Sequence, residues 1–311
     1  MLSTLTRAAT SGVTKAVNWA VNPRPGHDFA ELTAAVRGKN VLITGASYGV
    51  GAATARLLAK AGATVLLAAR TEERLAEVAH EITASGGTAY FYCADLADPV
   101  SAEALAGTIL AEHGHVDIVV SNAGKSIRRS VELQYDRFHD FERTIGINYL
   151  GPVRMLLALL PSMRARGQGQ IINVSTIGVR LTPAPRWGAY QASKSAFDTW
   201  LRSIAPEIAG DGVGVSTFYP SLIYTRMSAP TPIMRQLPGL TSAEAAEIVG
   251  RAIVTRERAI GPWWLMPAEV GSVLLAGPVT WALGVLYRNT DDTPSANGEA
   301  TTGTSRASAE R

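Results

Sequence analysis

The feature of this chain that most constrains its fold is a series of six short apolar runs, separated by segments long enough to form crossover helices. Such runs are typical of parallel strands buried on both faces. In one connection, Leu75, Val78, Ala79 and Ile82 form an apolar stripe at helical spacing. The pattern predicts an α/β fold, a doubly wound parallel sheet in a three-layer α/β/α arrangement, with ligands at the carboxyl ends of its strands. The runs are Val41–Ile43, Thr64–Ala69, Ala89–Cys93, Ile118–Ser121, Ile171–Ser175 and Val213–Tyr219.

The 311 residues contain one complete series of these signals, so we expect one catalytic domain, residues 38–260, with appended ends. Residues 1–37 should hold an accessory helix and a linker, because a loosely helical apolar pattern over 5–21 is followed by Asn22-Pro23-Arg24-Pro25-Gly26. Residues 289–311 are rich in Thr, Ser, Ala, Gly, Asp and Glu without an apolar cluster. We expect a disordered tail there.

Residues 261–288 form an apolar C-terminal extension. From Val270 to Tyr287 there is no charged residue, a length close to the lower limit for a membrane span. Gly271, Gly277, Pro278 and Gly284 disfavour a span. We expect a helix packed over the substrate site as a lid, with peripheral membrane association or a subunit interface as alternatives.

Composition excludes some classes of protein. A formal net charge of +3 does not demand a nucleic-acid partner, and we expect neither nucleic acid nor a bound metal. The single cysteine, Cys93, lies in an apolar run and is predicted to be a buried, inert thiol, which fits a reducing compartment. Polar residues from Thr6 to Lys15 interrupt any secretory signal. We therefore expect a cytoplasmic protein.

A glycine-rich turn follows the first apolar run directly and opens an alanine-rich helix, Ala52 to Ala61. Glycines let the backbone approach a pyrophosphate, whose charge is favoured by free N–H groups at a helix N-terminus. The turn, Thr44 to Gly51, supplies the candidate cofactor residues Gly45, Ser47, Tyr48, Gly49, Val50 and Gly51.

The second run ends in Ala68-Ala69-Arg70, without the acid that would bind an adenosine ribose. Because a guanidinium suits a 2′-phosphate, the cofactor is predicted to be NADP(H). After the third run, Asp95 can either hold the adenine edge with Leu96 or cap a turn. Asn122, Ala123 and Gly124 close the fourth run on the same side.

Tyr190 and Lys194 lie one helical turn apart in Tyr190-Gln191-Ala192-Ser193-Lys194, so both side chains can face one cleft. A neighbouring cation favours the phenolate and lowers the pKa of a tyrosine towards neutrality. Such a phenol can give or take the proton that accompanies hydride transfer.

Taken together, these motifs with Asn148 and Ser175 resemble the short-chain dehydrogenase/reductase family over roughly residues 38–260. The resemblance implies a Rossmann fold and a homo-oligomer. It also implies that Tyr190 is the acid/base, Lys194 lowers its pKa and binds the nicotinamide ribose, Ser175 holds the substrate oxygen, and Asn148 supports a proton relay. Thr176 rivals Ser175, because the stretch to Tyr190 is a little longer than is usual. Pro220, Ile223 and Thr225 would contact the cofactor, although Ser221 replaces the family's glycine.

The segments Asn122–Ser130 and Tyr135–Arg143 further resemble actinobacterial short-chain reductases of the fatty acyl-CoA type. Lys125, Arg128 and Arg129 could meet a phosphate or carboxylate on the substrate, or belong to a solvated loop or a subunit contact. We therefore expect reduction of a lipid-like carbonyl, such as an acyl-CoA, fatty aldehyde or 3-oxoacyl group. The alternatives are a steroid, polyketide or other small alcohol as substrate, or a non-catalytic NADP(H)-binding scaffold.

Overall fold

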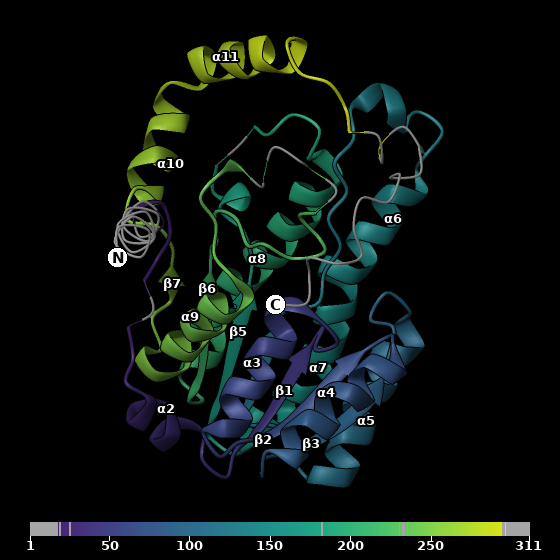
Figure 1. The fold of residues 1–311 in the computed structure, drawn as a ribbon, viewed down its shortest axis with the longest axis vertical. Coiled ribbons are helices and arrows are strands. Elements are labelled where there is room, and N and C mark those ends of the chain that lie inside the picture. Colours follow the sequence, from purple (N-terminus) through teal and green to yellow (C-terminus); the bar gives the residue numbers. More distant parts are fainter. Residues whose placement is uncertain are drawn as a thin grey trace, which may run out of the picture.

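A parallel sheet of seven strands, in the order β3-β2-β1-β4-β5-β6-β7, forms the centre of the molecule in the computed structural model (Figure 1). The structure describes residues 18, 20–24, 26–181, 183–229, 231, 234, 236–293 and 296. Strand order reverses between β1 and β4, which confirms the predicted doubly wound topology. The strands are β1 (Asn40–Thr44), β2 (Thr64–Ala69), β3 (Thr88–Cys93), β4 (Ile118–Ser121), β5 (Gly169–Val174), β6 (Val213–Phe218) and β7 (Ala259–Ile260).

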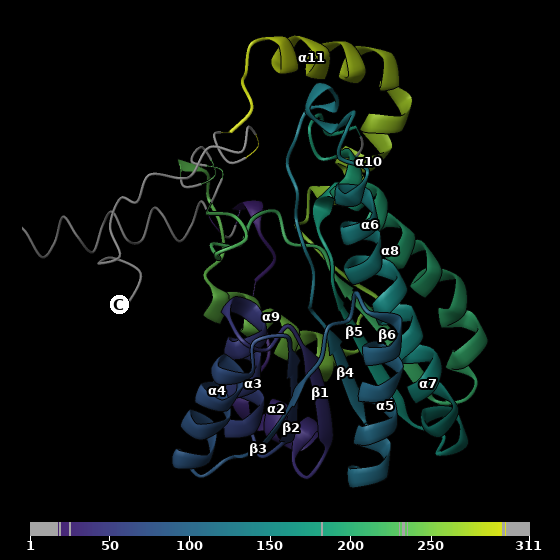
Figure 2. The same ribbon diagram turned by 90° about the vertical axis from the view of Figure 1, so that its right-hand side faces the viewer.

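Two helical layers cover the sheet (Figure 2). Alternate residues of each strand face opposite layers: Val41 and Ile43 pack with α2, α3, α4 and α9, whereas Leu42 packs with α5, α7 and α8. Both faces are therefore buried, which is why the strands read as continuous apolar runs. The helices are α2 (Phe29–Val36), α3 (Gly49–Lys60), α4 (Glu72–Ala84), α5 (Pro99–His113), α6 (His139–Ile145), α7 (Gly151–Ala165), α8 (Gly188–Ala209), α9 (Ser242–Thr255), α10 (Leu265–Leu274) and α11 (Ala276–Arg288), with short turns η1 (Val131–Gln134), η2 (Gly146–Leu150) and η3 (Ile177–Val179).

The two edges of the sheet differ from the sequence-based expectation. β3 is an edge strand with most of its side chains exposed, so the prediction of a buried thiol at Cys93 is wrong. Its Sγ donates to the carbonyl of Arg70 at 3.4 Å. At the other edge, β7 is too short to give a sequence signal.

The ends of the chain are only partly described. The predicted helix over 5–21 lies mostly outside the described residues, although Asn18, Ala20 and Val21 are helical. Within the predicted linker, α2 forms an additional helix because Asp28 and Glu31 make a capping box at its start. At the other end, Asp292 and Thr290 make specific contacts with Arg186, whereas residues 297–311, most of the expected tail, lie outside the described part.

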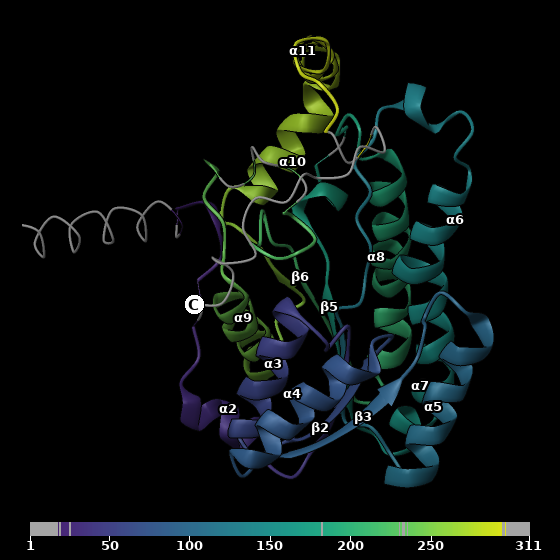
Figure 3. The ribbon, with the colours of Figure 1, turned by 45° about the vertical axis from the view of Figure 1, so that its right-hand side comes forward.

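Helices α10 and α11 form an arch at one tip of the molecule (Figures 1 and 3). They are bent by 100° at Leu275, and together they are long and apolar enough, by length and composition alone, to cross a membrane. So does the rod His139–Ala165, formed by α6, η2 and α7, but 56% of its apolar window is buried, as expected of a core helix. The structure differs from the lid expectation, because the side chains of the arch are mostly exposed rather than packed over the site.

Candidate active site

A cavity of about 710 Å³ opens at the carboxyl ends of the strands, beside the point where strand order reverses. The structure brings together most of the predicted site residues in its wall. Asp95, Asn148 and Gly51 are not in that wall, and neither is any residue of 261–288. The predicted site residues in the wall are Gly45, Ser47, Tyr48, Gly49, Val50, Arg70, Leu96, Asn122, Ala123, Gly124, Ser175, Tyr190, Lys194, Pro220, Ile223 and Thr225.

The glycine turn brings backbone to the cavity. Gly45 has φ of 67°, in the left-handed region, and a Cβ there would lie 2.9 Å from the Cα of Ala123. Gly51 instead serves packing, because a Cβ there would meet the Gly45 carbonyl oxygen at 2.3 Å. No side chain caps the N-terminus of α3. Its free N–H groups can therefore hold an anion, as the sequence predicts for a pyrophosphate.

Hydrogen bonds of Thr44 join the ends of β1 and β4. Thr44 Oγ1 accepts from the backbone N–H groups of Asn122 and Ala123, each at 3.0 Å. Asn122 Nδ2 returns a bond to the Thr44 carbonyl at 3.0 Å. Thr44 therefore positions the Asn122–Gly124 segment. The sequence identified Thr44 only as the first residue of the glycine-rich turn.

At the adenosine end, the wall carries Arg70 with its side chain 63% exposed, and Asp95 Oδ2 lies 3.8 Å from its Nη1. Asp95 Oδ1 accepts from the Ala97 N–H at 2.9 Å, so this carboxylate caps a turn, one of its two predicted roles. Arg226, also in the wall, adds a positive charge at this end. Its guanidinium lies 4.0 Å from the ring centre of Tyr48. The adenosine end of the cavity therefore carries two guanidinium groups and the carboxylate of Asp95.

Tyr190 and Lys194 enter the cavity from α8, opposite Ser175 at the end of β5. Ser175 Oγ is buried and makes no hydrogen bond with the described residues, so it is free to bind an oxygen of a ligand. Thr176 Oγ1, its rival, already accepts from the Gly178 N–H at 3.2 Å. This difference favours Ser175 for the hydroxyl role.

Burial shifts the pKa values of both Tyr190 and Lys194. Burial raises the pKa of Tyr190 to about 12, although a hydrogen bond with Thr176 acts in the opposite direction. Burial also lowers the pKa of Lys194 to about 8, and its Nζ donates to the Val174 carbonyl at 3.1 Å. The direction of the Tyr190 pKa shift is opposite to the expected one, because desolvation outweighs the hydrogen bond with Thr176.

Asn148 lies behind the cavity in η2, a single π-helical turn. Its Oδ1 accepts from the Lys125 N–H and its Nδ2 donates to the Lys125 carbonyl, each at 2.8 Å. Nδ2 also donates to Ser193 Oγ at 2.9 Å, and this hydroxyl donates to the Tyr190 carbonyl. Ser193 had no distinguishing sequence signal beyond its place between Tyr190 and Lys194. Asn148 therefore fixes the segment after β4, at Lys125, against α8 at Ser193. Its role in a proton relay stays a prediction.

The departure at Ser221 also has a structural account. Ser221 Oγ donates to Asn22 Oδ1, so the N-terminal linker supports the segment that carries Ile223 and Thr225.

Two basic residues of the loop after β4, Arg129 and Lys125, have different surroundings. Arg129 Nη1 binds the buried Asp140 at 2.7 Å, whereas burial, Arg143 and Arg70 lower the pKa of Lys125.

An apolar wall that sequence reasoning did not identify surrounds the reacting end of the cavity. The Trp187 ring lies 5.8 Å from the Tyr190 ring, at a tilt of 60°. The residues of this wall come from the loop before α8 and the segment after β6. Irregular structure there leaves no periodic signal in the sequence. The wall residues are Leu181, Pro183, Ala184, Trp187, Met227 and Met234.

A doubly wound sheet with a glycine turn at its switch point, facing a tyrosine–lysine pair, defines an oxidoreductase that binds a dinucleotide. A family model for the short chain dehydrogenases matches residues 39–236, more than half of the chain. The protein belongs to the short-chain dehydrogenase family.

Two relatives named as fatty acyl-CoA reductases are similar over most of the chain. A fatty acyl-CoA reductase of Acinetobacter baylyi is 47% identical over 225 residues, covering 72% of this chain and 76% of the relative. A fatty acyl-CoA reductase of Mycobacterium tuberculosis is 41% identical over 268 residues, covering 86% and 89%. The likeness to this type of reductase is thus confirmed.

Two solved structures, one with NADP and the other with NAD, share the fold. A metagenomic short-chain oxidoreductase in complex with NADP matches with a TM-score of 0.62 at 31% identity, covering 71% of this chain and 92% of that one. A Burkholderia phymatum family member in complex with NAD matches with a TM-score of 0.69 at 24% identity, covering 78% and 96%.

Proposed function

We propose that this oxidoreductase uses NADP(H) to interconvert a carbonyl and an alcohol on a lipid-like substrate. The observation that carries the substrate class is the apolar wall of Leu181, Pro183, Ala184 and Trp187, next to Tyr190. An acyl chain can replace water along this wall, whereas a small polar alcohol gains little there. The two relatives named as fatty acyl-CoA reductases support the same class.

The cofactor preference rests on Arg70 and on the absence of an acid among the described wall residues at the end of β2, Ala68 to Thr71. The uncapped N-terminus of α3 and the Gly45 backbone would hold the pyrophosphate, and Arg70 the 2′-phosphate. When bound, NADPH supplies the hydride.

The protein's own residues supply the rest of the reaction. Ser175 Oγ, otherwise unpartnered, donates a hydrogen bond to the carbonyl oxygen of the substrate. As the carbonyl carbon of an aldehyde or ketone gains the hydride, Tyr190 gives its phenolic proton to that oxygen, and an alcohol forms. With an acyl-CoA the same two transfers give a thiohemiacetal, whose C–S bond breaks to release the CoA thiol and leave the aldehyde. The Lys194 ammonium, six per cent exposed, compensates the phenolate that remains. In the oxidative direction the same proton returns to Tyr190.

A substrate panel with NADPH tests the proposal by loss of nicotinamide absorbance. Acyl-CoAs, fatty aldehydes and 3-oxoacyl thioesters should be turned over. Efficiency should rise by up to about tenfold for every two carbons, since each buried methylene adds about 0.8 kcal/mol. Turnover restricted to steroid ketones or other small carbonyl compounds would favour the alternative substrate class. NADPH binding without turnover of any compound would leave a scaffold.

We also propose a cytoplasmic homo-oligomer. The free thiol of Cys93 suits a reducing compartment. A groove between α7 and α8 combines apolar residues such as Leu157, Trp200 and Ile204 with the charged residues Arg164, Glu207 and Asp211, and offers a mixed surface to a second copy. Light scattering of the full chain measures the oligomeric state directly, and a Leu157→Glu variant should shift it towards the monomer.

A further inference from the structure

The arch of α10 and α11 exposes apolar side chains to an extent unusual for a protein surface. Leu274 is 77% exposed and Trp281 71%, and α11 buries none of its residues against the body. Monomeric surfaces rarely carry contiguous apolar patches of this kind unless something covers them. The other exposed members are Met266, Val270, Val273, Leu275 and Leu286.

The arch also carries almost no charge. Glu269 is the acid of α10, and the Arg180 guanidinium binds it, with Nε to Oε1 at 2.7 Å. α11 has no acid, and its charged residue, Arg288, lies in its last turn. Trp281 lies within α11, and tryptophan is a side chain enriched where a membrane meets water.

The geometry of the arch excludes a simple span. α11 has 13 residues, about 20 Å of helix, which is shorter than the hydrocarbon core of about 30 Å. The 100° bend prevents α10 from adding to that length in a straight line. A short apolar helix lying across the tip of the molecule, as Figures 1 and 3 show α11, suits insertion into one leaflet.

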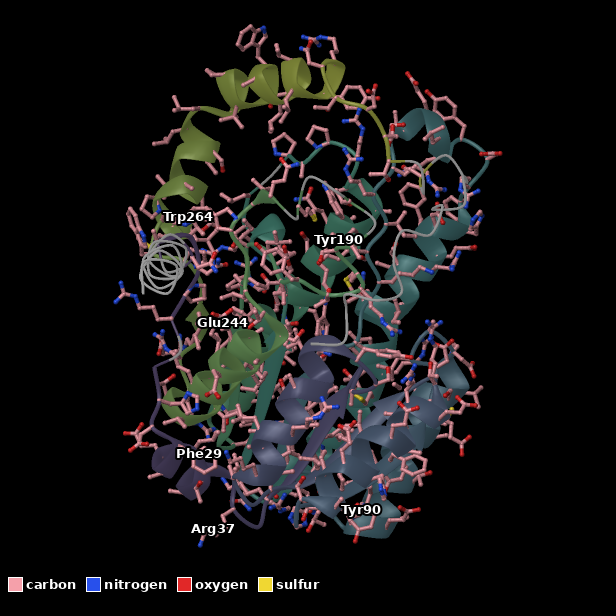
Figure 4. All side chains as sticks on the ribbon, in the orientation of Figure 1. Phe29, Arg37, Tyr90, Tyr190, Glu244 and Trp264 are labelled. Atoms are coloured by element: carbon pink, nitrogen blue, oxygen red, sulfur yellow. The ribbon has the colours of Figure 1, made fainter. Side chains whose placement is uncertain are left out.

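Contacts at both ends hold the arch to the loop between Ser175 and Tyr190. Arg180 binds Glu269 at α10, and Arg186 lies 4.3 Å from the Tyr287 ring centre and donates to Thr290 Oγ1 at 3.0 Å. Figure 4 shows Tyr190 below the arch, with Trp264 at the base of α10. The orientation of the cavity relative to the arch is therefore fixed.

We propose that the α10–α11 arch is a monotopic docking surface that inserts into one leaflet of a lipid bilayer, with the catalytic cavity held facing the membrane. The occupant is a bilayer rather than a second copy, because α11 is apolar and open around most of its circumference. A protein partner would cover one face, whereas lipid chains surround a helix. This inference goes beyond the proposed function and does not depend on the substrate.

The test uses the full chain and vesicles of phosphatidylcholine, with or without a minor share of phosphatidylglycerol. Because the exposed surface is apolar rather than basic, the protein should co-sediment with both kinds of vesicle and stay bound in high salt. The double variant Leu274→Glu/Trp281→Glu should lower the partition coefficient by about tenfold or more. Val100→Glu, an equally exposed position at the start of α5, is the matched control and should bind like the original protein.

Two further readouts separate docking from other causes. NADPH affinity and melting temperature should be unchanged in the double variant, which excludes misfolding. The tryptophan emission should shift to the blue on adding vesicles, and Trp281→Phe should remove much of that shift. Three results would overturn the proposal: no binding to either vesicle, binding only to phosphatidylglycerol and only in low salt, or a change in oligomeric state by Trp281→Glu without lipid.

Discussion

Arg70 reaches the cavity from the end of β2, where a ribose-binding acid would otherwise stand. Arg70→Asp should reverse cofactor preference, because the new carboxylate repels a 2′-phosphate and accepts hydrogen bonds from a ribose. Dissociation constants for NADPH and NADH measure the change, with Arg56→Asp on the outer side of α3 as a charge-matched control. A variant that still prefers NADPH would remove Arg70 from the phosphate site.

Tyr190 is the residue whose loss should separate binding from chemistry. Tyr190→Phe keeps the ring beside Trp187 but removes the transferable proton. Turnover should fall about a hundredfold or more while NADPH affinity stays within a few-fold. Steady-state kinetics and fluorescence titration give the two values, and near-normal turnover would mean that another group supplies the proton.

Lys194 should set the alkaline limit of the reaction. Its pKa lies at about 8, so it loses its charge as pH rises through that value, whereas Tyr190, with a pKa of about 12, stays protonated. For carbonyl reduction, kcat/KM should therefore be level below pH 8 and fall above it, since this ratio reports groups of the free enzyme.

Lys194→Arg keeps the charge at all these pH values, so its residual kcat/KM should lack the fall near pH 8. The NADPH dissociation constant of the original protein, measured over the same range, provides a second readout that does not need turnover. A fall near pH 8 that persists in the arginine variant would assign the limit to another group.

Among the elements, the junction of β1 and β4 depends on one hydroxyl. Thr44→Val removes the acceptor of two backbone N–H groups while keeping the side-chain shape. Leaving these groups unsatisfied should cost about 1–3 kcal/mol of unfolding free energy and weaken NADPH binding. Urea titration gives the first value. Thr64→Val at the start of β2 is the control, and an equal loss there would refute a special role for Thr44.

The elements that the sequence predicted well are those with buried faces. The runs that became β1, β2 and β4 are apolar because helices cover them on both sides, so their limits were readable within a residue or two. β3 carries a similar run at an open edge, and the exposure of Cys93 could not be read from composition. β7 has two residues, and its pairing with β6 depends on tertiary contacts.

The candidate site divides in the same way. Tyr190, Lys194 and the glycine turn could be predicted because their spacing along the chain is itself the chemical requirement. The apolar wall and the contact of Asn148 with Ser193 could not, because they join segments distant in sequence. The pKa of Tyr190 was predicted in the wrong direction, since sequence spacing contains no information about desolvation.

Across the whole molecule, the arch and the catalytic body should unfold separately. α11 buries none of its residues, so opening it exposes little additional apolar area. Hydrogen exchange of residues 265–288 should be much faster than that of β1 and β4. Arg180→Ala should speed exchange in α10 by releasing Glu269, while the melting temperature of the body shifts by only a few degrees. Uniform protection of arch and body would contradict this division.

The π-turn of η2 has a consequence for the rotational phase of the long rod His139–Ala165. One extra residue rotates everything before it by about 100° relative to everything after it. Asp140, buried against Arg129, lies on one side of this step, and Met155 in the core lies on the other. Deleting one residue from the turn could keep either side in place but not both. The number of residues in that turn, as much as the identity of any side chain, therefore sets which faces of the two halves of the rod are buried.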